Sequence, residues 1–274
     1  MQFSDHTFGT VKSGVCVLSG FVTSVREELG HLVVRDGIKG AETERRYPRA
    51  SCPISRLIAV RSEGYITLAA MHWLDAIGAA LVVLDPTGRP VVTSVPRRSV
   101  RHSARLRRTQ AQLGIGGGRG AEIARELIEA KITGQISLLR ELDRSEAADR
   151  ATEFAAQLPP AGSGRFPLLG IEGRVSNIYW SAFADWPIAF TTRDPVPNTW
   201  RTFGAHRSVL TGRPKTAVSP ANAITNYLYN IALSETVIAL QAAGLDPTMG
   251  ILHGDVKDER ASAAYDLLEP LLYY

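Results

Sequence analysis

Three polar residues in the second half of the sequence lie in stretches that are otherwise apolar. Glu172 lies in PLLGIEGRVSNIYW, His253 in GILHGD and Asp266 in AAYDLLEP. A carboxylate that is buried without a partner is costly, so each acid on an apolar face needs an arginine, another cation or a metal. Two carboxylates and a neutral imidazole suit Mg²⁺ or Mn²⁺ and leave positions open for water and phosphate oxygens.

Other interpretations of the three residues stay open at this point. The chain has 27 acidic residues and six histidines, so such a trio can arise by chance. Glu172 can pair with Arg174 or another arginine, His253 can cap a turn, and Asp266 can face solvent. Glu269 follows Asp266 by three residues and so lies near it on a helix. It is either a supporting group for the site or an exposed acid before a proline.

Arginines dominate a second stretch with possible chemistry. No acidic residue occurs between positions 86 and 121, whereas eight arginines do. A guanidinium group is always charged and can bind two phosphate oxygens at once. A solvated helix face is the alternative, but the lack of counter-charge favours contact with a polyanion. The candidate DNA-binding residues of this block are Arg97, Arg98, Arg101, Arg105 and Arg108.

The elements that position these residues differ between the two parts of the chain. Up to about residue 95, short β-type runs alternate with turn residues, and one helical stripe covers 68–78. After Pro96 the pattern becomes helical, most clearly over 121–158 and 220–244. The sequence therefore predicts an α+β protein, with a β-rich N-terminal domain over 1–95 and an all-α domain over 96–274.

Bulk composition excludes several classes of protein. Hydrophobic residues make up 45% and charged residues 21% of the 274 positions, as in globular proteins. The longest apolar run, 76–84, is too short to span a bilayer, and the N-terminus lacks signal-peptide features. Cys16 and Cys52 are too few for a disulfide framework. We expect a cytoplasmic protein with no membrane partner.

Four sequence blocks occur in an order that is specific to one family. The blocks are IEGRVSNIYW, PANAITNYLYNIAL, AAGLDPTMGILHGD and SAAYDLLEP. In this order they resemble the signature of the CRISPR-associated integrase, the metal-dependent "Cas-one" family, which inserts new spacers into CRISPR arrays. Looser agreement extends the resemblance over nearly the whole chain. The family's metal ligands and catalytic residues fall on Glu172, His253 and Asp266, so the resemblance implies one Mg²⁺ or Mn²⁺ site.

The resemblance also implies an assembly and a reaction. It implies a β-sandwich-like N-terminal domain that forms a homodimer, a helical catalytic domain, and a small ferredoxin-like partner protein. The expected substrate is double-stranded DNA, in which a 3′-hydroxyl attacks a phosphodiester at the repeat boundary. The bound ion would neutralise the reacting phosphate and lower the pKa of the attacking hydroxyl.

Several neighbouring motif residues are expected to support this site. Asn222 and Asn226 are candidates for hydrogen bonds to the backbone around it. Tyr179 either positions a DNA end or packs in the core. Arg174 and Ser176 are predicted to lie on a turn after the motif glutamate, from which they would reach phosphate.

The C-terminus departs from the family pattern. Family members usually continue beyond the Glu-Pro pair into further helices, whereas Glu269-Pro270 is followed here by LLYY. The sequence therefore predicts a shortened C-terminus. The alternative function is a catalytically weakened DNA-binding subunit, or a truncated family member that needs a missing C-terminal part.

Overall fold

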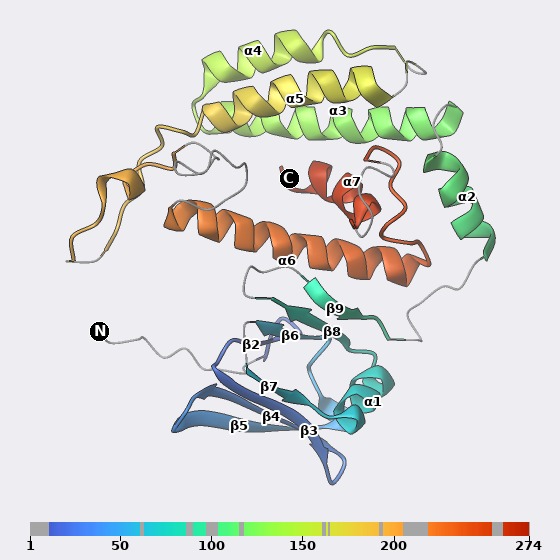
Figure 1. Ribbon diagram of the computed structural model, residues 1–274, viewed down its shortest axis with the longest axis vertical. Helices are drawn as coiled ribbons and strands as arrows, with labels where there is room; N and C mark the ends of the chain where they lie inside the picture. The colour runs from blue at the N-terminus through green and yellow to red at the C-terminus, as the bar shows by residue number, and fades with distance from the viewer. Residues whose placement is uncertain are drawn as a thin grey trace. The chain divides into compact units, whose positions relative to one another are not determined.

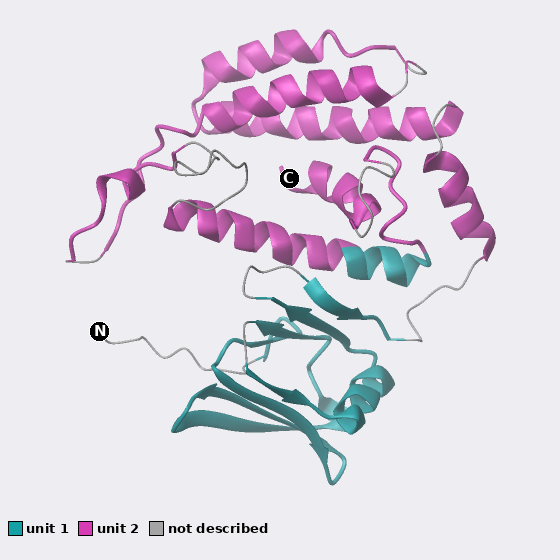
Figure 2. Ribbon diagram, viewed as in Figure 1, with its two compact units in different colours: residues 1–102, 237–244 teal, residues 103–236, 245–274 magenta. Residues whose placement is uncertain are grey.

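A computed structural model gives the fold (Figure 1). The residues that it describes are 11–60, 63–85, 90–96, 104–114, 118–160, 163, 165–191, 194–204, 219–253 and 260–273. The chain divides into two compact units (Figure 2). One comprises Met1–His102 with Val237–Gly244, and the other Ser103–Thr236 with Leu245–Tyr274. The sequence placed the boundary at 95/96 and did not anticipate that 237–244 would belong with the first unit.

The first unit contains two β-sheets. The five-stranded sheet has the order β1 (Val11–Lys12), β2 (Val15–Leu18), β6 (Arg56–Val60), β8 (Ala80–Leu84), β9 (Pro90–Ser94). Its three central strands are parallel, and the two outer strands pair antiparallel. The four-stranded sheet has the order β5 (Ala41–Pro48), β4 (His31–Ile38), β3 (Val22–Glu28), β7 (Glu63–Ile66). There only β3 and β7 are parallel.

One apolar core joins both sheets to a helix. Leu32 and Leu57 come from different sheets, and both are fully buried in one cluster with Leu74. Leu74 belongs to α1 (Leu68–Ile77), which begins after Thr67, whose side chain accepts a hydrogen bond from the backbone N–H of Ala70 at 3.2 Å. This is the N-cap geometry that the apolar stripe at 68–78 requires.

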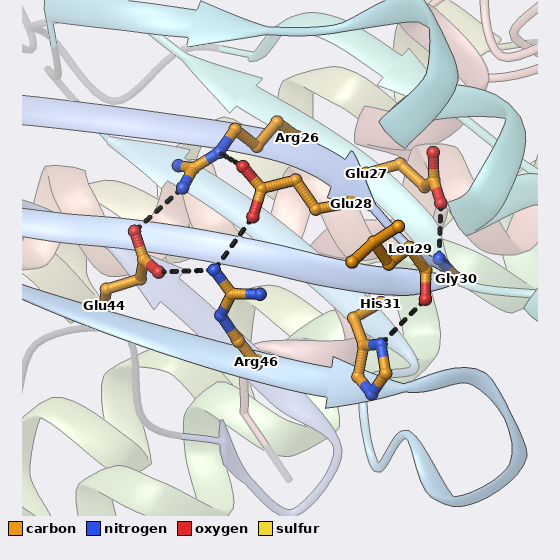
Figure 3. A network of polar contacts seen from close by, with 8 residues as sticks. All are labelled: Arg26, Glu27, Glu28, Leu29, Gly30, His31, Glu44 and Arg46. Carbon is orange, nitrogen blue, oxygen red and sulfur yellow. Dashed lines mark hydrogen bonds and ion pairs between the residues drawn. The ribbon is translucent and has the colours of Figure 1, made fainter.

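A polar network covers part of the four-stranded sheet (Figure 3). Arg26 of β3 pairs with Glu28 and Glu44, each at 2.9 Å, and Arg46 of β5 pairs with the same two glutamates at 2.9 and 3.3 Å. The four side chains form a closed ring of alternating charge. Strand β5, AETERRYP, was not predicted because these charged residues mask the apolar alternation that identifies a strand.

The second unit is helical. Its helices are α2 (Ala104–Gly114), α3 (Gly118–Glu141), α4 (Ser145–Ala155), α5 (Arg165–Ser181), α6 (Pro220–Ala243) and α7 (Ser262–Leu271). The last turns of α6 belong to the first unit. Helices α3, α4 and α5 lie side by side (Figure 1). Over the parts of this unit that the structure describes, the sole β-type pairing outside strands is the Pro187–Thr202 bridge.

The helical core explains why the second unit folds as it does. Ile128 and Ile132 of α3 are buried with Leu168 and Val175 of α5, which are the apolar positions of the 3.6-residue pattern. Sheets followed by helices confirm the predicted α+β class. Within the described ranges, no helix combines the length and apolar character that crossing a bilayer requires.

Candidate active site

Asp266 is buried on α7 and bound by four hydrogen-bond donors. Its Oδ2 accepts from the backbone N–H groups of Ile251 and Leu252 at 2.6 and 2.9 Å. Its Oδ1 accepts from the backbone N–H of His253 at 3.1 Å and contacts His253 Nδ1 at 2.7 Å. A carboxylate has about four acceptor positions. All of them are used by donors of the 251–253 segment, so the charge on this apolar helix is compensated.

The close approach of the 251–253 segment to α7 depends on Gly250, which precedes it. A Cβ at Gly250 would lie 2.7 Å from Ser262 Cβ and 3.0 Å from Asp266 Oδ2. Both distances are shorter than ordinary van der Waals contact, so a larger residue would push the segment away from the helix. Gly250 therefore belongs to the structural support of the site.

His253 is oriented by the Asp266 carboxylate. In the neutral imidazole, Nδ1–H donates to Asp266 Oδ1, and Nε2 then carries the lone pair. This arrangement is typical of histidines that bind a metal through the other ring nitrogen. The dyad therefore presents Nε2 as a ligand or a base.

Glu172 lies on α5 in an ion-paired, partly buried position. Its Oε1 accepts from Ser176 Oγ at 2.8 Å and forms an ion pair with the Lys131 ammonium. Burial raises the pKa of Glu172, but the Lys131 ammonium and the Ser176 hydroxyl outweigh burial, and the pKa lies below its usual range. Glu172 is thus held as a carboxylate by partners on α3 and α5.

Lys131 of α3 links two of the carboxylates. Its side chain is 7% exposed, and Nζ contacts both Glu172 Oε1 and, at 2.5 Å, Glu269 Oε2 on α7. Burial lowers the pKa of Lys131, but the two glutamates outweigh burial and raise it. One ammonium therefore ties together α3, α5 and α7.

Gln135 extends these contacts by one helical turn. Its Nε2 donates to Tyr273 Oη at 3.0 Å and to Ser176 Oγ at 3.4 Å. Sequence reasoning missed both Lys131 and Gln135. The available signal was their i, i+4 spacing in IEAKITGQ, beside Ile128 and Ile132, which places two polar groups on the edge of an apolar stripe.

The donor chemistry of the site suits a divalent cation, but the arrangement is not a closed ligand set. Across the described part of the chain, no group of three or more His, Cys, Asp or Glu side chains is placed to hold a metal ion. Asp266 has its acceptor positions filled, and Lys131 stands between two acids. The acids and the Nε2 of His253 nevertheless fit Mg²⁺ or Mn²⁺ by ligand type and by excess negative charge.

The family follows from comparison with known sequences. The family described as CRISPR associated protein Cas1 matches residues 17–272. The chain belongs to this family.

Individual Cas1 relatives differ in how much of them the chain covers. It is 35% identical over 186 residues to CRISPR-associated endonuclease Cas1 1 of Archaeoglobus fulgidus, covering 61% of this chain and 50% of that protein. It is 27% identical over 278 residues to CRISPR-associated endonuclease Cas1 of Korarchaeum cryptofilum, covering 95% and 75% respectively. The chain thus spans half the length of the first relative and three quarters of the second.

Solved structures agree on the fold. A Cas1 protein from Thermotoga maritima superposes with a TM-score of 0.69 at 18% identity, covering 94% of this chain and 75% of that one. A casposase bound to integration product superposes with a TM-score of 0.68 at 21% identity, covering 94% of this chain and 69% of that one. At these identities the likeness shows the Cas1 fold.

Two of the other motif residues of this Cas1 chain, Asn222 and Tyr179, make packing or capping contacts. The buried Asn222 donates through Nδ2 to the Phe203 carbonyl at 2.7 Å and to Ser219 Oγ at 2.9 Å, which fixes the start of α6. Asn226 lies one turn further along α6 and is partly buried. Tyr179 is buried, with edge-on contacts to Trp180, Phe183 and Tyr273, as packing requires.

The predicted turn after Glu172 is wrong. Arg174 and Ser176 lie inside α5, which continues to Ser181 because Val175 and Ile178 bury its apolar face. The guanidinium of Arg174 lies 5.5 Å from the centre of the Phe154 ring. Ser176 is held by Glu172. Neither residue therefore extends from a turn toward phosphate.

The arginine block is described only in part. Arg105 and Arg108 are exposed on α2. Arg97, Arg98 and Arg101 lie outside the described residues. DNA contact by this block stays a prediction.

Proposed function

We propose that this chain is a divalent-metal-dependent DNA endonuclease and integrase of CRISPR adaptation. The 3′-hydroxyl of a captured DNA fragment would attack a phosphodiester at the repeat boundary, so that a new phosphodiester bond forms while the original P–O3′ bond breaks and its oxygen leaves as a 3′-hydroxyl. The observation that carries the proposal is that Lys131 joins Glu172 of α5 to Glu269 of α7, the helix on which Asp266 orients His253. Glu172, His253 and Asp266 all lie in the four family blocks. A buried, charged cluster without such a role would be an expensive feature of a helical core.

The named relatives support this reaction class. Both curated proteins described above are named endonucleases, and the casposase structure holds an integration product. A Cas6-RT-Cas1–Cas2 complex matches with a TM-score of 0.64 at 19% identity, covering 98% of this chain and 28% of that one. We extend DNA binding and a Cas-protein partner to this chain. We propose further that the DNA is double-stranded, that the chain forms a homodimer through the first unit, and that the partner is small and ferredoxin-like.

Each residue of the site has a definite task in the proposed reaction. Glu172 and His253 Nε2 would hold Mg²⁺ or Mn²⁺, and Asp266 holds the imidazole in the tautomer that exposes Nε2. Ligation by Asp266 itself remains part of the proposal and requires release of one of its present hydrogen bonds. A bound ion supplies charge neutralisation at the phosphate and a lower pKa for the attacking hydroxyl.

Strand transfer tests the proposal directly. The purified chain with its partner protein and Mn²⁺ should join a 3′-hydroxyl duplex to a supercoiled plasmid that carries the repeat. Chelation with EDTA should stop joining, and Glu172→Gln should reduce it at least about 100-fold. Joining at full rate in EDTA would contradict metal dependence.

A catalytically weakened DNA-binding subunit is the second candidate. Two observations favour it: the filled acceptor positions of Asp266 and the Lys131 ammonium between Glu172 and Glu269. For such a subunit, DNA binding in a filter assay should persist while strand transfer is absent with Mg²⁺, Mn²⁺ or any other divalent ion.

A further inference from the structure

Lys131 occupies the position that a cation would take between two acids. Its ammonium contacts one oxygen of Glu172 and one oxygen of Glu269, and its side chain is 7% exposed. Glu172 and Glu269 come from different helices, α5 and α7, so their carboxylates would repel each other without a positive charge between them. Lys131 therefore determines how these two acids are held.

The charge of the cluster remains unbalanced in spite of Lys131. Two carboxylates, those of Glu172 and Glu269, face the single ammonium of Lys131, and the third, Asp266, contacts His253, which adds no charge when it is neutral. The excess is negative and lies in a partly buried region, where the Coulomb interaction with a cation is stronger than in water. A divalent ion entering this region meets Lys131 as a competitor for Glu172.

We infer that Lys131 is the resident counter-ion of the site, a positioning residue that holds Glu172 and Glu269 in the metal-free protein and competes with a divalent ion for them. The inference rests on the proposed metal-dependent function. It assigns to Lys131 a task beyond packing, because a buried ion pair contributes little net stability compared with apolar residues of similar volume. If Lys131 served only to pack the helices, its replacement would leave the affinity for a divalent ion unchanged.

Mn²⁺ binding by the metal-free protein, measured by calorimetry, tests the inference without any activity assay. Lys131→Met removes the competing charge and should tighten Mn²⁺ binding at least about tenfold, since removal of a unit charge near a carboxylate changes the interaction by more than the ~1.4 kcal/mol that a tenfold change requires. Lys131→Arg keeps the charge and should not tighten binding. The control is Lys39→Met, an exposed lysine of the first unit that should bind Mn²⁺ as the wild type does.

Thermal unfolding provides a second readout. Without metal, Lys131→Met should unfold at a lower temperature than the wild type, because two partly buried acids lose their counter-ion. Added Mn²⁺ should raise its unfolding temperature by more than it raises that of the wild type. If Lys131→Met does not fold, Glu269→Gln gives the second test: Lys131 then pairs with Glu172 alone, and Mn²⁺ should bind more weakly.

The outcomes separate the two ideas. Equal Mn²⁺ affinity in the wild type and Lys131→Met, or in the wild type and Glu269→Gln, overturns the counter-ion role and leaves the proposed function standing. No Mn²⁺ binding by the wild type or by any variant overturns the metal-dependent function and the inference together.

Discussion

Asp266 both holds a backbone segment and orients a histidine side chain. It accepts three backbone hydrogen bonds, which fix the segment 251–253, and it orients the His253 ring. The sequence identified the acid by its apolar surroundings and interpreted it as a metal ligand. The structure gives its burial a sufficient reason in hydrogen bonding alone, and ligation by Asp266 stays a prediction.

Replacement of Asp266 and of His253 should therefore affect stability differently. Asp266→Asn puts an NH₂ group where the backbone donors need an acceptor, and we expect a loss of about 3 kcal/mol in unfolding free energy. His253→Ala keeps the three backbone bonds and should lose about 1 kcal/mol. Urea denaturation measures both. The control, exposed Asp149→Asn on α4, should stay within about 0.5 kcal/mol of the wild type. Equal losses of unfolding free energy in Asp266→Asn and His253→Ala would show that the backbone hydrogen bonds of Asp266 do not carry the larger share of its stabilisation.

At the scale of elements, the sequence predicted the helices and strands that have a clear apolar periodicity. It missed the features that depend on tertiary contacts. The change from short strands to long helices was readable, and so was the helix at 68–78. Strand β5 was missed because charged side chains fill it, and the turn predicted after Glu172 is wrong because α5 continues through it to Ser181. Lys131 was missed because a lysine in a helical pattern usually faces water, and only tertiary structure brings two acids to it.

Gly250 tests how the loop and α7 fit together. Gly250→Ala places a methyl group against Ser262 and Asp266, and we expect a loss of about 1–3 kcal/mol in unfolding free energy. Gly170→Ala is the matched control. Gly170 lies in α5 with no atom within 4 Å of an added Cβ, so it should gain up to about 1 kcal/mol of helix stability. Urea denaturation of the two variants distinguishes a steric effect from a general effect of glycine removal. A gain of unfolding free energy at both positions would contradict the close approach of Gly250 to Ser262 and Asp266.

The charged ring on the four-stranded sheet predicts a pH effect. The hydrogen bonds from Arg26 lower the pKa of both Glu28 and Glu44 below 4.5. A lowered folded-state pKa means that the stabilisation is present above pH 4.5 and is lost as pH falls through the lowered values. NMR titration of the carboxyl groups should show both values rising in Arg26→Met. Unchanged values in that variant would show that Arg26 does not hold the acids.

At the scale of the whole molecule, the chain combines a β-rich unit, a helical unit with one charged cluster, and a basic helix at the start of the helical unit. The family match over 17–272 shows the fold. The order of sequence blocks was sufficient to identify the family, because the motifs are local. The sequence did not predict the division into units, because residues 237–244 join the first unit through contacts between segments far apart in the sequence.

Nucleic-acid binding should depend on α2 more than on other exposed arginines. Arg105→Glu reverses a charge on this helix, and we expect affinity for double-stranded DNA to fall about tenfold, with a salt dependence weaker by about one unit in the slope of log K against log salt. Arg150→Glu on α4 changes the same charge on another exposed helical residue and should have a smaller effect. Fluorescence anisotropy at several salt concentrations measures both. Equal losses would indicate a response to net charge alone.

The joining rate of His253→Ala tests the central claim most directly, because this variant keeps the backbone contacts of Asp266 and alters only the group that presents Nε2. The matched control is His72→Ala, an exposed histidine on α1. With partner protein, Mn²⁺ and a repeat-bearing plasmid, we predict that His253→Ala joins DNA ends at least about 100-fold more slowly than the wild type. His72→Ala should join them at the wild-type rate. Wild-type joining by His253→Ala would contradict the assignment of this cluster as the active site.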